Sequence, residues 1–187
     1  NRSRLTGPGI EVKAGEFILA VDGVDARSVK NVYALLENKA ERVVELSVNS
    51  RPASAGARTL RVKTIANEQN LRYLDWVDQR RAMVDKLSGG RIGYIHLPNT
   101  AGDGNRELNK WLAPLAHKDA LIIDDRYNGG GFIPDRMIEL LARTPLNYWK
   151  RRGLEPQPTP GIVHRGPKAM LINGLSSSGG DALPYYF

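Results

Sequence analysis

The stretch ALIIDDRYNGGGF, residues 120–132, decides the fold class of this 187-residue chain. It opens with a near-continuous apolar run that ends at Asp124, a pattern typical of a strand buried on both faces of a parallel sheet. Gly129, Gly130 and Gly131 follow shortly after the strand. Glycine tolerates positive φ, so such a loop can turn its N–H groups into a shared concavity. Taken alone, the stretch is equally compatible with a site for an anion or developing oxyanion and with a flexible turn that binds nothing.

Helices and strands are expected to alternate around this run. The predicted order is a helix at 75–87, a strand at 92–97, a helix at 105–115, the strand at 120–124, a helix at 134–143, a second buried strand at 168–173 and the start of a helix at 180–187. Alternation of this kind implies βαβ units and a largely parallel sheet.

The first third of the chain has a different pattern, that of a small β-rich module. A strand at 16–21 is followed by Asp22-Gly23, which predicts a tight hairpin turn. Ser28 is expected to cap a helix whose apolar residues recur at helical spacing up to Leu36. Two further strands are predicted at 43–48 and 58–65, joined by a loop.

A second motif with possible chemistry is NGLSSSGGD, residues 173–181, directly after the second buried strand. Ser178 is expected at a strand-to-helix turn, exposed and close to a helix N-terminus that favours negative charge. The backbone amide of Gly179 can serve as an oxyanion donor. The alternative is that a serine here only caps the helix, and the spacing G-x-S-x-G is not matched. On spacing alone both interpretations stay open.

Composition narrows the function classes. The absence of cysteine excludes disulfides, thiolate metal sites and a cysteine nucleophile, and it is compatible with a reducing cytoplasm. The net charge is +7, but basic residues are interleaved with acidic ones, so no nucleic-acid partner is expected. No apolar run approaches the roughly 18 residues that span a bilayer, so no membrane partner is expected. No metal and no cofactor are expected either.

The motifs resemble a known family. Residues 15–23, GEFILAVDG, are similar to the G-D-x-I-L-x-V-[DN]-G signature of bacterial PDZ domains. Residues 93–98, 121–132 and 178–181 resemble the tricorn protease family, which is related to the tail-specific and C-terminal processing peptidases. The resemblance implies an α/β fold plus a β-rich module. By this resemblance, residues 1–66 form a PDZ-like domain whose N-terminal part is missing, and residues 67–90 form a helical connector. Residues 91–187 then form a ClpP/crotonase-like catalytic α/β domain that is truncated at its C-terminus.

The same resemblance assigns roles within the candidate site. It implies that Ser178 is the nucleophile and that the amides of Gly131 and Gly179 form the oxyanion hole, while Asp181 supports the turn. Substrate contacts are expected at Gly129, Gly130 and Trp149. Trp149 aligns with an aspartate that receives basic side chains in tricorn, which predicts a pocket for apolar or small residues in this chain.

A serine nucleophile needs a base. His96 is expected in the core, His117 at a helix end and His164 at the surface, and none has the context of the family's catalytic histidine. The base and its orienting acid are therefore expected outside this sequence, which leaves an incomplete active site.

The leading prediction is a serine endopeptidase that acts on peptides or unfolded polypeptides through an acyl-enzyme at Ser178, in a cytoplasmic homo-oligomer. The rival is a non-catalytic fragment that only binds peptides or has a structural role. A third alternative, a thioester oxyanion hole as in crotonase-like proteins, lacks any feature for acyl-CoA recognition.

Overall fold

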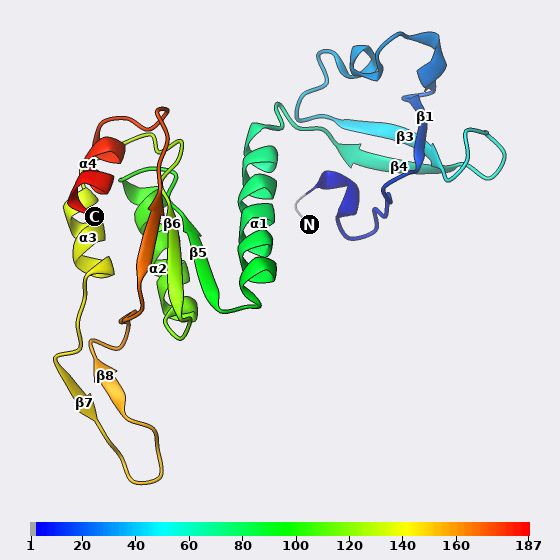
Figure 1. Cartoon of the computed structure of the whole chain (residues 1–187). Helices are drawn as coiled ribbons and strands as arrows, with labels where there is room; N and C mark the ends of the chain where they lie inside the picture. Colours follow the sequence, from blue (N-terminus) through cyan, green and yellow to red (C-terminus); the bar gives the residue numbers. More distant parts are fainter. Residues whose placement is uncertain (1–2) are drawn as a thin grey trace. The chain divides into compact units, whose positions relative to one another are not determined.

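The computed structural model describes residues 3–187, so the first two residues of the predicted first domain lie outside it (Figure 1). The chain divides into two compact units, Asn1–Asp75 and Trp76–Phe187. Each unit has its own apolar core, as expected for two small domains.

The first unit is built on an antiparallel sheet in the order β2-β1-β3-β4. Its elements are η1 (Arg4–Thr6), β1 (Phe17–Val21), β2 (Val24–Asp25), η2 (Ala26–Ser28), η3 (Val32–Leu36), β3 (Val43–Asn49) and β4 (Arg58–Lys63). Alternate residues of β3 point into the core, where Val44, Leu46 and Val48 are buried. The β-rich module is thereby confirmed.

The predicted Asp-Gly turn is confirmed. Val21 pairs with Val24 across it, and both turn residues have positive φ, 49° at Asp22 and 80° at Gly23. These are the conformations that a two-residue hairpin turn requires. The Asp22 carboxylate also accepts a hydrogen bond from the Glu45 amide at 2.8 Å, which ties the turn to β3.

The prediction of a single helix capped by Ser28 was wrong. The segment makes two short 3₁₀ helices, and Ser28 is the last residue of η2 rather than a cap. Asn31 caps η3 instead, by accepting a hydrogen bond from the Tyr33 amide at 3.0 Å. Asn side chains favour such caps over helix interiors, because they compete with the α-helical ladder for nearby amides.

The second unit contains a parallel sheet in the order β5-β6-β9. Its elements are β5 (Ile92–His96), α2 (Gly102–Leu115), β6 (Ala120–Asp124), α3 (Pro134–Leu141), β7 (Asn147–Trp149), β8 (Gln157–Thr159), β9 (Lys168–Leu171) and α4 (Gly179–Tyr186). Helix α1 (Gln69–Ser88) begins in the first unit and lies alongside β5, where the Trp76 ring meets His96 edge-on at 5.2 Å (Figure 1). The predicted α/β fold is confirmed.

The core of this unit lies between the sheet and helices α2, α3 and α4. It contains Ile95, Leu108, Leu121, Ile123, Met137 and Leu183, each at most 1 % exposed. The prediction that β9 is buried was wrong: it is an edge strand with alternate residues exposed, including Leu171. The hairpin of β7 and β8 was not predicted, and all three residues of β7 are exposed.

Gly104, in α2, packs where the preceding loop and α3 leave no room for a side chain. A Cβ at Gly104 would overlap the carbonyl of Asn99 and lie 3.1 Å from the Met137 methyl group, whereas Gly102, in the same helix, faces open space. We predict that Gly104→Ala lowers the free energy of unfolding of this unit by about 1–3 kcal/mol, because backbone must shift to admit the methyl group.

The matched control is Gly102→Ala, for which the expected change is within about 0.5 kcal/mol. In urea unfolding of the 187-residue chain, tryptophan fluorescence reports on this unit, because the three tryptophans of the sequence, Trp76, Trp111 and Trp149, all lie in it. Equal shifts of the two midpoints would contradict the packing argument.

Candidate active site

Two motifs meet at one edge of the parallel sheet. β6 and β9 are neighbours, with Asp124 opposite Leu171 at their carboxyl ends. The glycine loop, residues 128–131, follows β6, and the serine turn, residues 176–180, follows β9. Ligand sites of α/β sheets lie at this edge, so the topology brings the two predicted motifs together.

Backbone contact between the two segments is so close that only glycine fits. A Cβ on Gly130 would lie 2.7 Å from the Ser177 carbonyl oxygen and 2.9 Å from the Ser178 Cβ. A Cβ on Gly179 would overlap the Gly131 carbonyl. Gly130 also has φ of 82°, a conformation that L residues rarely adopt. The glycines are therefore required by packing as well as by backbone conformation.

Ser178 has a strained backbone. Its φ of 56° and ψ of −120° are unusual for a residue with a Cβ, and its side chain is exposed. Its carbonyl accepts the amides of Asp181 at 2.9 Å and Ala182 at 3.1 Å, which fixes the start of α4. The side chain makes no capping hydrogen bond, so the simple helix-cap interpretation does not apply to this serine. Strain of this kind is concentrated at functional sites.

The backbone amides at the junction divide into engaged and free groups. Gly129 donates to the Pro98 carbonyl at 3.0 Å and Gly130 donates to the Asn128 side chain at 2.8 Å. Within residues 3–187, the amides of Gly131 and Gly179 donate to no acceptor of the chain. These two free amides belong to the segments that are in direct contact beside Ser178.

A third segment, missed by the sequence analysis, braces the glycine loop. The Thr100 amide donates to the Gly130 carbonyl at 3.0 Å, and the Thr100 carbonyl accepts from Ile133 at 3.1 Å. The Thr100 hydroxyl is buried without a partner in the described chain and lies against Gly179. In the sequence, the only sign of this role of Thr100 was its position shortly after Pro98, which ends a predicted strand.

Below the loop, Asp124 is an ion-paired core residue. Arg126 binds both of its oxygens, at 2.8 and 2.6 Å, and the Tyr94 hydroxyl donates at 2.6 Å. Burial works to raise the pKa of Asp124, but the hydrogen bonds from Arg126 and Tyr94 outweigh it and hold that pKa below its usual range. Asp124 is thus a charged anchor at the end of β6.

The next carboxyl group behaves in the opposite way. Asp125 is completely buried, and burial raises its pKa to about 7. The nearby charges of Asp124 and Asp181 act in the same direction, against the opposing hydrogen bond from Asn128. Adjacent carboxyl groups in the chain therefore have widely separated pKa values because only one has a cationic partner.

The histidines are not placed as bases for Ser178. His96 is buried as predicted, and its Nε2 lies 3.0 Å from the Arg126 carbonyl. The prediction that His164 is at the surface was wrong: it is 3 % exposed, and its Nε2 lies 2.9 Å from the Lys118 carbonyl. Lys118 precedes β6, at the strand end opposite the serine turn. Burial lowers the pKa of both His96 and His164. His117 is exposed just after α2.

Trp149 is not brought to the serine turn. It lies on β7, 66 % exposed, and its indole donates to the Thr159 hydroxyl at 3.0 Å. The β7–β8 hairpin extends from the end of the unit away from the start of α4 (Figure 1). Its role in a specificity pocket stays a prediction. Gly129, in contrast, lies in the glycine loop with an exposed backbone.

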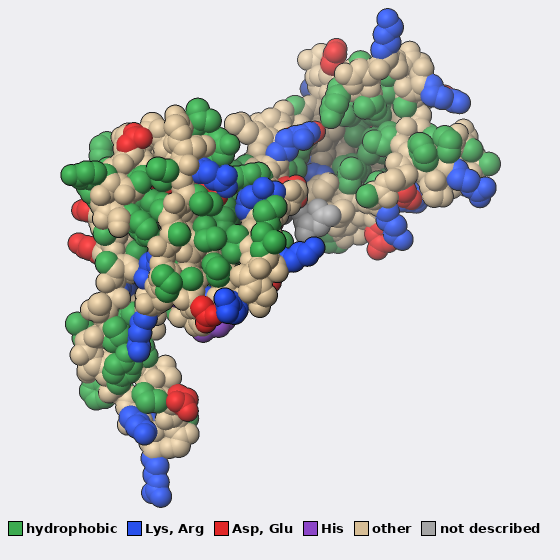
Figure 2. Space-filling view, viewed as in Figure 1, with side chains coloured by type: hydrophobic (Ala, Val, Ile, Leu, Met, Phe, Trp, Pro, Cys, Tyr) green, Lys and Arg blue, Asp and Glu red, His purple; other side chains and the backbone are tan. Residues whose placement is uncertain are grey.

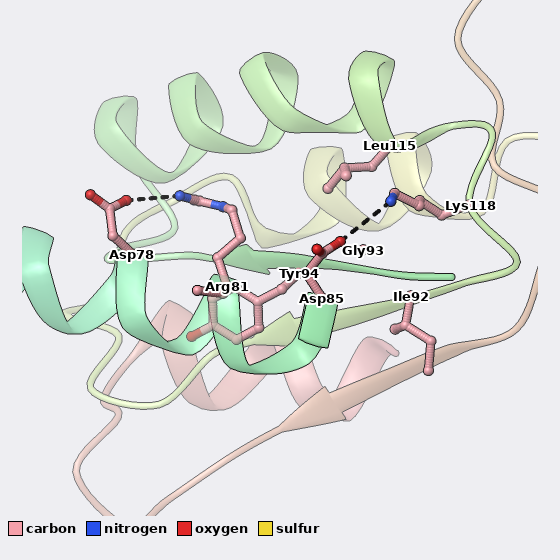
Figure 3. Close-up of a pocket in the computed structure, with 9 residues that line it drawn as sticks. Asp78, Arg81, Asp85, Ile92, Gly93, Tyr94, Leu115 and Lys118 are labelled. Carbon is pink, nitrogen blue, oxygen red and sulfur yellow. Dashed lines mark hydrogen bonds and ion pairs between the residues drawn. The ribbon is translucent and has the colours of Figure 1, made fainter. Parts of the chain in front are cut away.

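A cavity of about 360 Å³ lies elsewhere, at the amino-terminal end of β5. Ion pairs border it: Arg81 with Asp78 at 2.9 Å, and Lys118 with Asp85 at 3.6 Å (Figure 3). Because the serine turn follows the carboxyl end of β9, this cavity is separate from the candidate active site.

Lys and Arg side chains are scattered between apolar and neutral groups on the face drawn in Figure 2, without a continuous basic patch. In the described part of the chain, no group of three or more acidic or histidine side chains is placed to hold a metal ion. Residues 3–187 also include no helix with the length and apolarity needed to cross a membrane.

Comparison with known proteins agrees with this geometry. The family model of the tricorn protease PDZ domain matches residues 1–67, and that of peptidase family S41 matches residues 91–187. Tricorn protease homolog 1 of Streptomyces coelicolor is 37 % identical over 181 residues, which are 96 % of this chain and 17 % of that protein. Tricorn protease of Thermoplasma volcanium is 32 % identical over 180 residues, 95 % of this chain and 17 % of its own length.

A solved structure also matches. The crystal structure of the tricorn protease superposes with a TM-score of 0.83 at 29 % identity, covering 92 % of this chain and 17 % of that one. This chain therefore spans about a sixth of the length of such relatives. By these matches, the chain belongs to peptidase family S41 and carries a tricorn protease PDZ domain ahead of its peptidase domain.

Proposed function

We propose that the protein containing this chain is a serine endopeptidase that cleaves peptides or unfolded polypeptides through an acyl-enzyme at Ser178. The observation that carries the proposal is the exposed, strained Ser178 beside two free amides, those of Gly131 and Gly179. Membership of peptidase family S41 supports the same reaction class.

In the proposed reaction the Ser178 oxygen attacks the carbonyl carbon of the scissile peptide bond. The hydroxyl proton passes to a general base, and the carbonyl oxygen becomes an oxyanion. Donors aimed at that oxygen, here the Gly131 and Gly179 amides, stabilise the negative charge where it develops. Collapse breaks the C–N bond, the leaving amine takes the proton, and water then hydrolyses the acyl-enzyme.

The base is proposed to come from a part of the protein beyond this chain. Among residues 3–187 no histidine forms a hydrogen bond with Ser178. Since the chain spans about a sixth of its relatives, most of such a protein is available to supply the base. A cytoplasmic homo-oligomer belongs to the same proposal, on the family resemblance alone.

We predict that a fluorophosphonate probe labels the full-length protein and that Ser178→Ala abolishes the labelling, because the probe reacts only with an activated serine. Ser54→Ala, which removes an exposed serine from the first unit, should leave labelling unchanged. In-gel fluorescence after timed labelling provides the measurement.

The outcomes separate the competing functions. Labelling that survives in Ser178→Ala refutes the assigned nucleophile. A full-length protein that is never labelled favours a non-catalytic, peptide-binding role for the PDZ and peptidase domains.

Substrate preference tests the proposed role of Trp149. An indole cannot pair with a cationic side chain as a carboxylate does, so cleavage is expected after apolar or small residues. Trp149→Asp should shift cleavage toward Lys and Arg, as read by mass spectrometry of a digested peptide library. Rapid cleavage after Lys or Arg by the unmodified protein, with none after apolar residues, contradicts this role.

A further inference from the structure

Asp125 has a central place beneath the candidate site. Its Oδ1 accepts a hydrogen bond from the Asn128 side-chain amide at 2.7 Å. Its main chain is held from two sides: the amide donates to the Leu171 carbonyl at 2.9 Å, and its carbonyl accepts the Ser176 hydroxyl at 2.8 Å. The residue therefore connects the ends of β6 and β9 below the two loops.

Asn128 links Asp125 to both the glycine loop and the serine turn. Its side-chain oxygen accepts the Gly130 amide at 2.8 Å, and its main-chain carbonyl accepts the Ser177 amide at 3.1 Å. Gly180 packs on it so closely that a Cβ there would lie 2.9 Å from the Asn128 Cβ. Asn128 is completely buried and contacts both loops.

We propose that Asp125 and Asn128 form a positioning pair for the reaction at Ser178. Asp125 fixes the rotation of the Asn128 amide, and Asn128 fixes the glycine loop against the serine turn. The Gly130 amide already donates to Asn128, so the donor that this loop offers to the substrate is the next amide, that of Gly131. This inference rests on the proposed acyl-enzyme at Ser178.

The environment of Asp125 favours the neutral form of its carboxyl group. Its Oδ2 is buried without a partner in the described chain, so a negative charge there is poorly compensated. The charged groups acting on it are Asp124, on β6, and Asp181, on α4, and both repel a second negative charge. Burial and these neighbours hold its pKa near 7, so the carboxyl is mostly neutral below that pH.

The sign of the stability effect follows from this shift. The folded state binds a proton that the unfolded state releases near pH 4, so the contribution of Asp125 to stability falls as the pH rises toward 7. A negative charge formed above pH 7 also opposes an oxyanion that develops on the glycine loop. Both effects disappear in Asp125→Asn, which keeps the shape of the side chain.

Asn173 provides a matched control for general loop bracing. Its side-chain oxygen accepts the amides of Tyr127, at 3.1 Å, and Leu175, at 3.2 Å, so it also joins the segments that follow β6 and β9. It makes no hydrogen bond to the glycines or to Ser178 in the described chain. Loss of Asn173 weakens the connection of the loops without releasing Gly130.

The experiment measures the saturation kinetics of fluorophosphonate labelling in the full-length protein. Asn128→Ala should lower the maximal labelling rate about a hundredfold, comparable to the loss of an oxyanion-hole donor, with little change in the half-saturating concentration. Asn173→Ala should lower the rate by less than about tenfold, the effect of ordinary hydrogen bonds. Asp125→Asn should label at near the unmodified rate at about pH 6 and lack the decline above pH 7.

The labelling rates of these variants can overturn the proposed role of Asp125 and Asn128. Equal losses in Asn128→Ala and Asn173→Ala overturn it, because general loop stability then explains both. If Asn128→Ala does not fold, as judged by tryptophan fluorescence, the pH profile decides: a profile of Asp125→Asn identical to that of the unmodified protein overturns the proposal. Labelling that survives in Ser178→Ala instead marks failure of the proposed function itself.

Discussion

The contact on which the candidate site depends is the direct approach of backbone to backbone between Gly130 and the Ser177–Ser178 peptide. It is possible because β6 and β9 are parallel neighbours whose carboxyl ends lie at one edge of the sheet. Any Cβ at Gly130 would separate the glycine loop from the serine turn. The segments that carry the free amides of Gly131 and Gly179 would then move apart.

Buried polar groups help to hold this contact in place. Strain at Ser178 costs on the order of 1–3 kcal/mol and persists only where surrounding structure holds it. Here the amides of Asp181 and Ala182 hold the Ser178 carbonyl from one side, while the Asp125–Asn128 connection holds the loop from the other. Asp124, neutralised by Arg126, anchors the strand end on which both depend. Donors that stabilise an oxyanion have to be held in place before the substrate arrives, and these hydrogen bonds are what would hold both segments in the proposed site.

Much of the fold could be read from local pattern. The apolar run at 120–124 forms β6 with the predicted bounds, and Asp22-Gly23 makes the expected turn. Errors arose where tertiary contacts outweigh local signals. His164 follows a proline-rich segment typical of surface, yet it is buried against the Lys118 carbonyl. The β7–β8 hairpin has too short and too exposed a pattern for period-based prediction.

Some residues of the candidate site could be found from the sequence, and others could not. Ser178, Gly131 and Gly179 were candidates because each follows a predicted strand, but a ligand-free turn or a simple helix cap explained the same pattern. The family resemblance assigned their chemical roles, which stay predictions. Asn128 and Thr100 were missed because their importance lies in hydrogen bonds to residues distant in sequence. Trp149 was placed by resemblance alone, and the hairpin on which it lies could not be anticipated from spacing.

A crystal structure of the full-length protein after reaction with a peptidyl phosphonate is the most direct test of the proposed role of Ser178. We expect a covalent bond from Ser178 to phosphorus, with the phosphonyl oxygen about 2.7–3.1 Å from both the Gly131 and Gly179 amide nitrogens. A phosphonyl oxygen that points away from these amides, or a bond to a different residue, would contradict it.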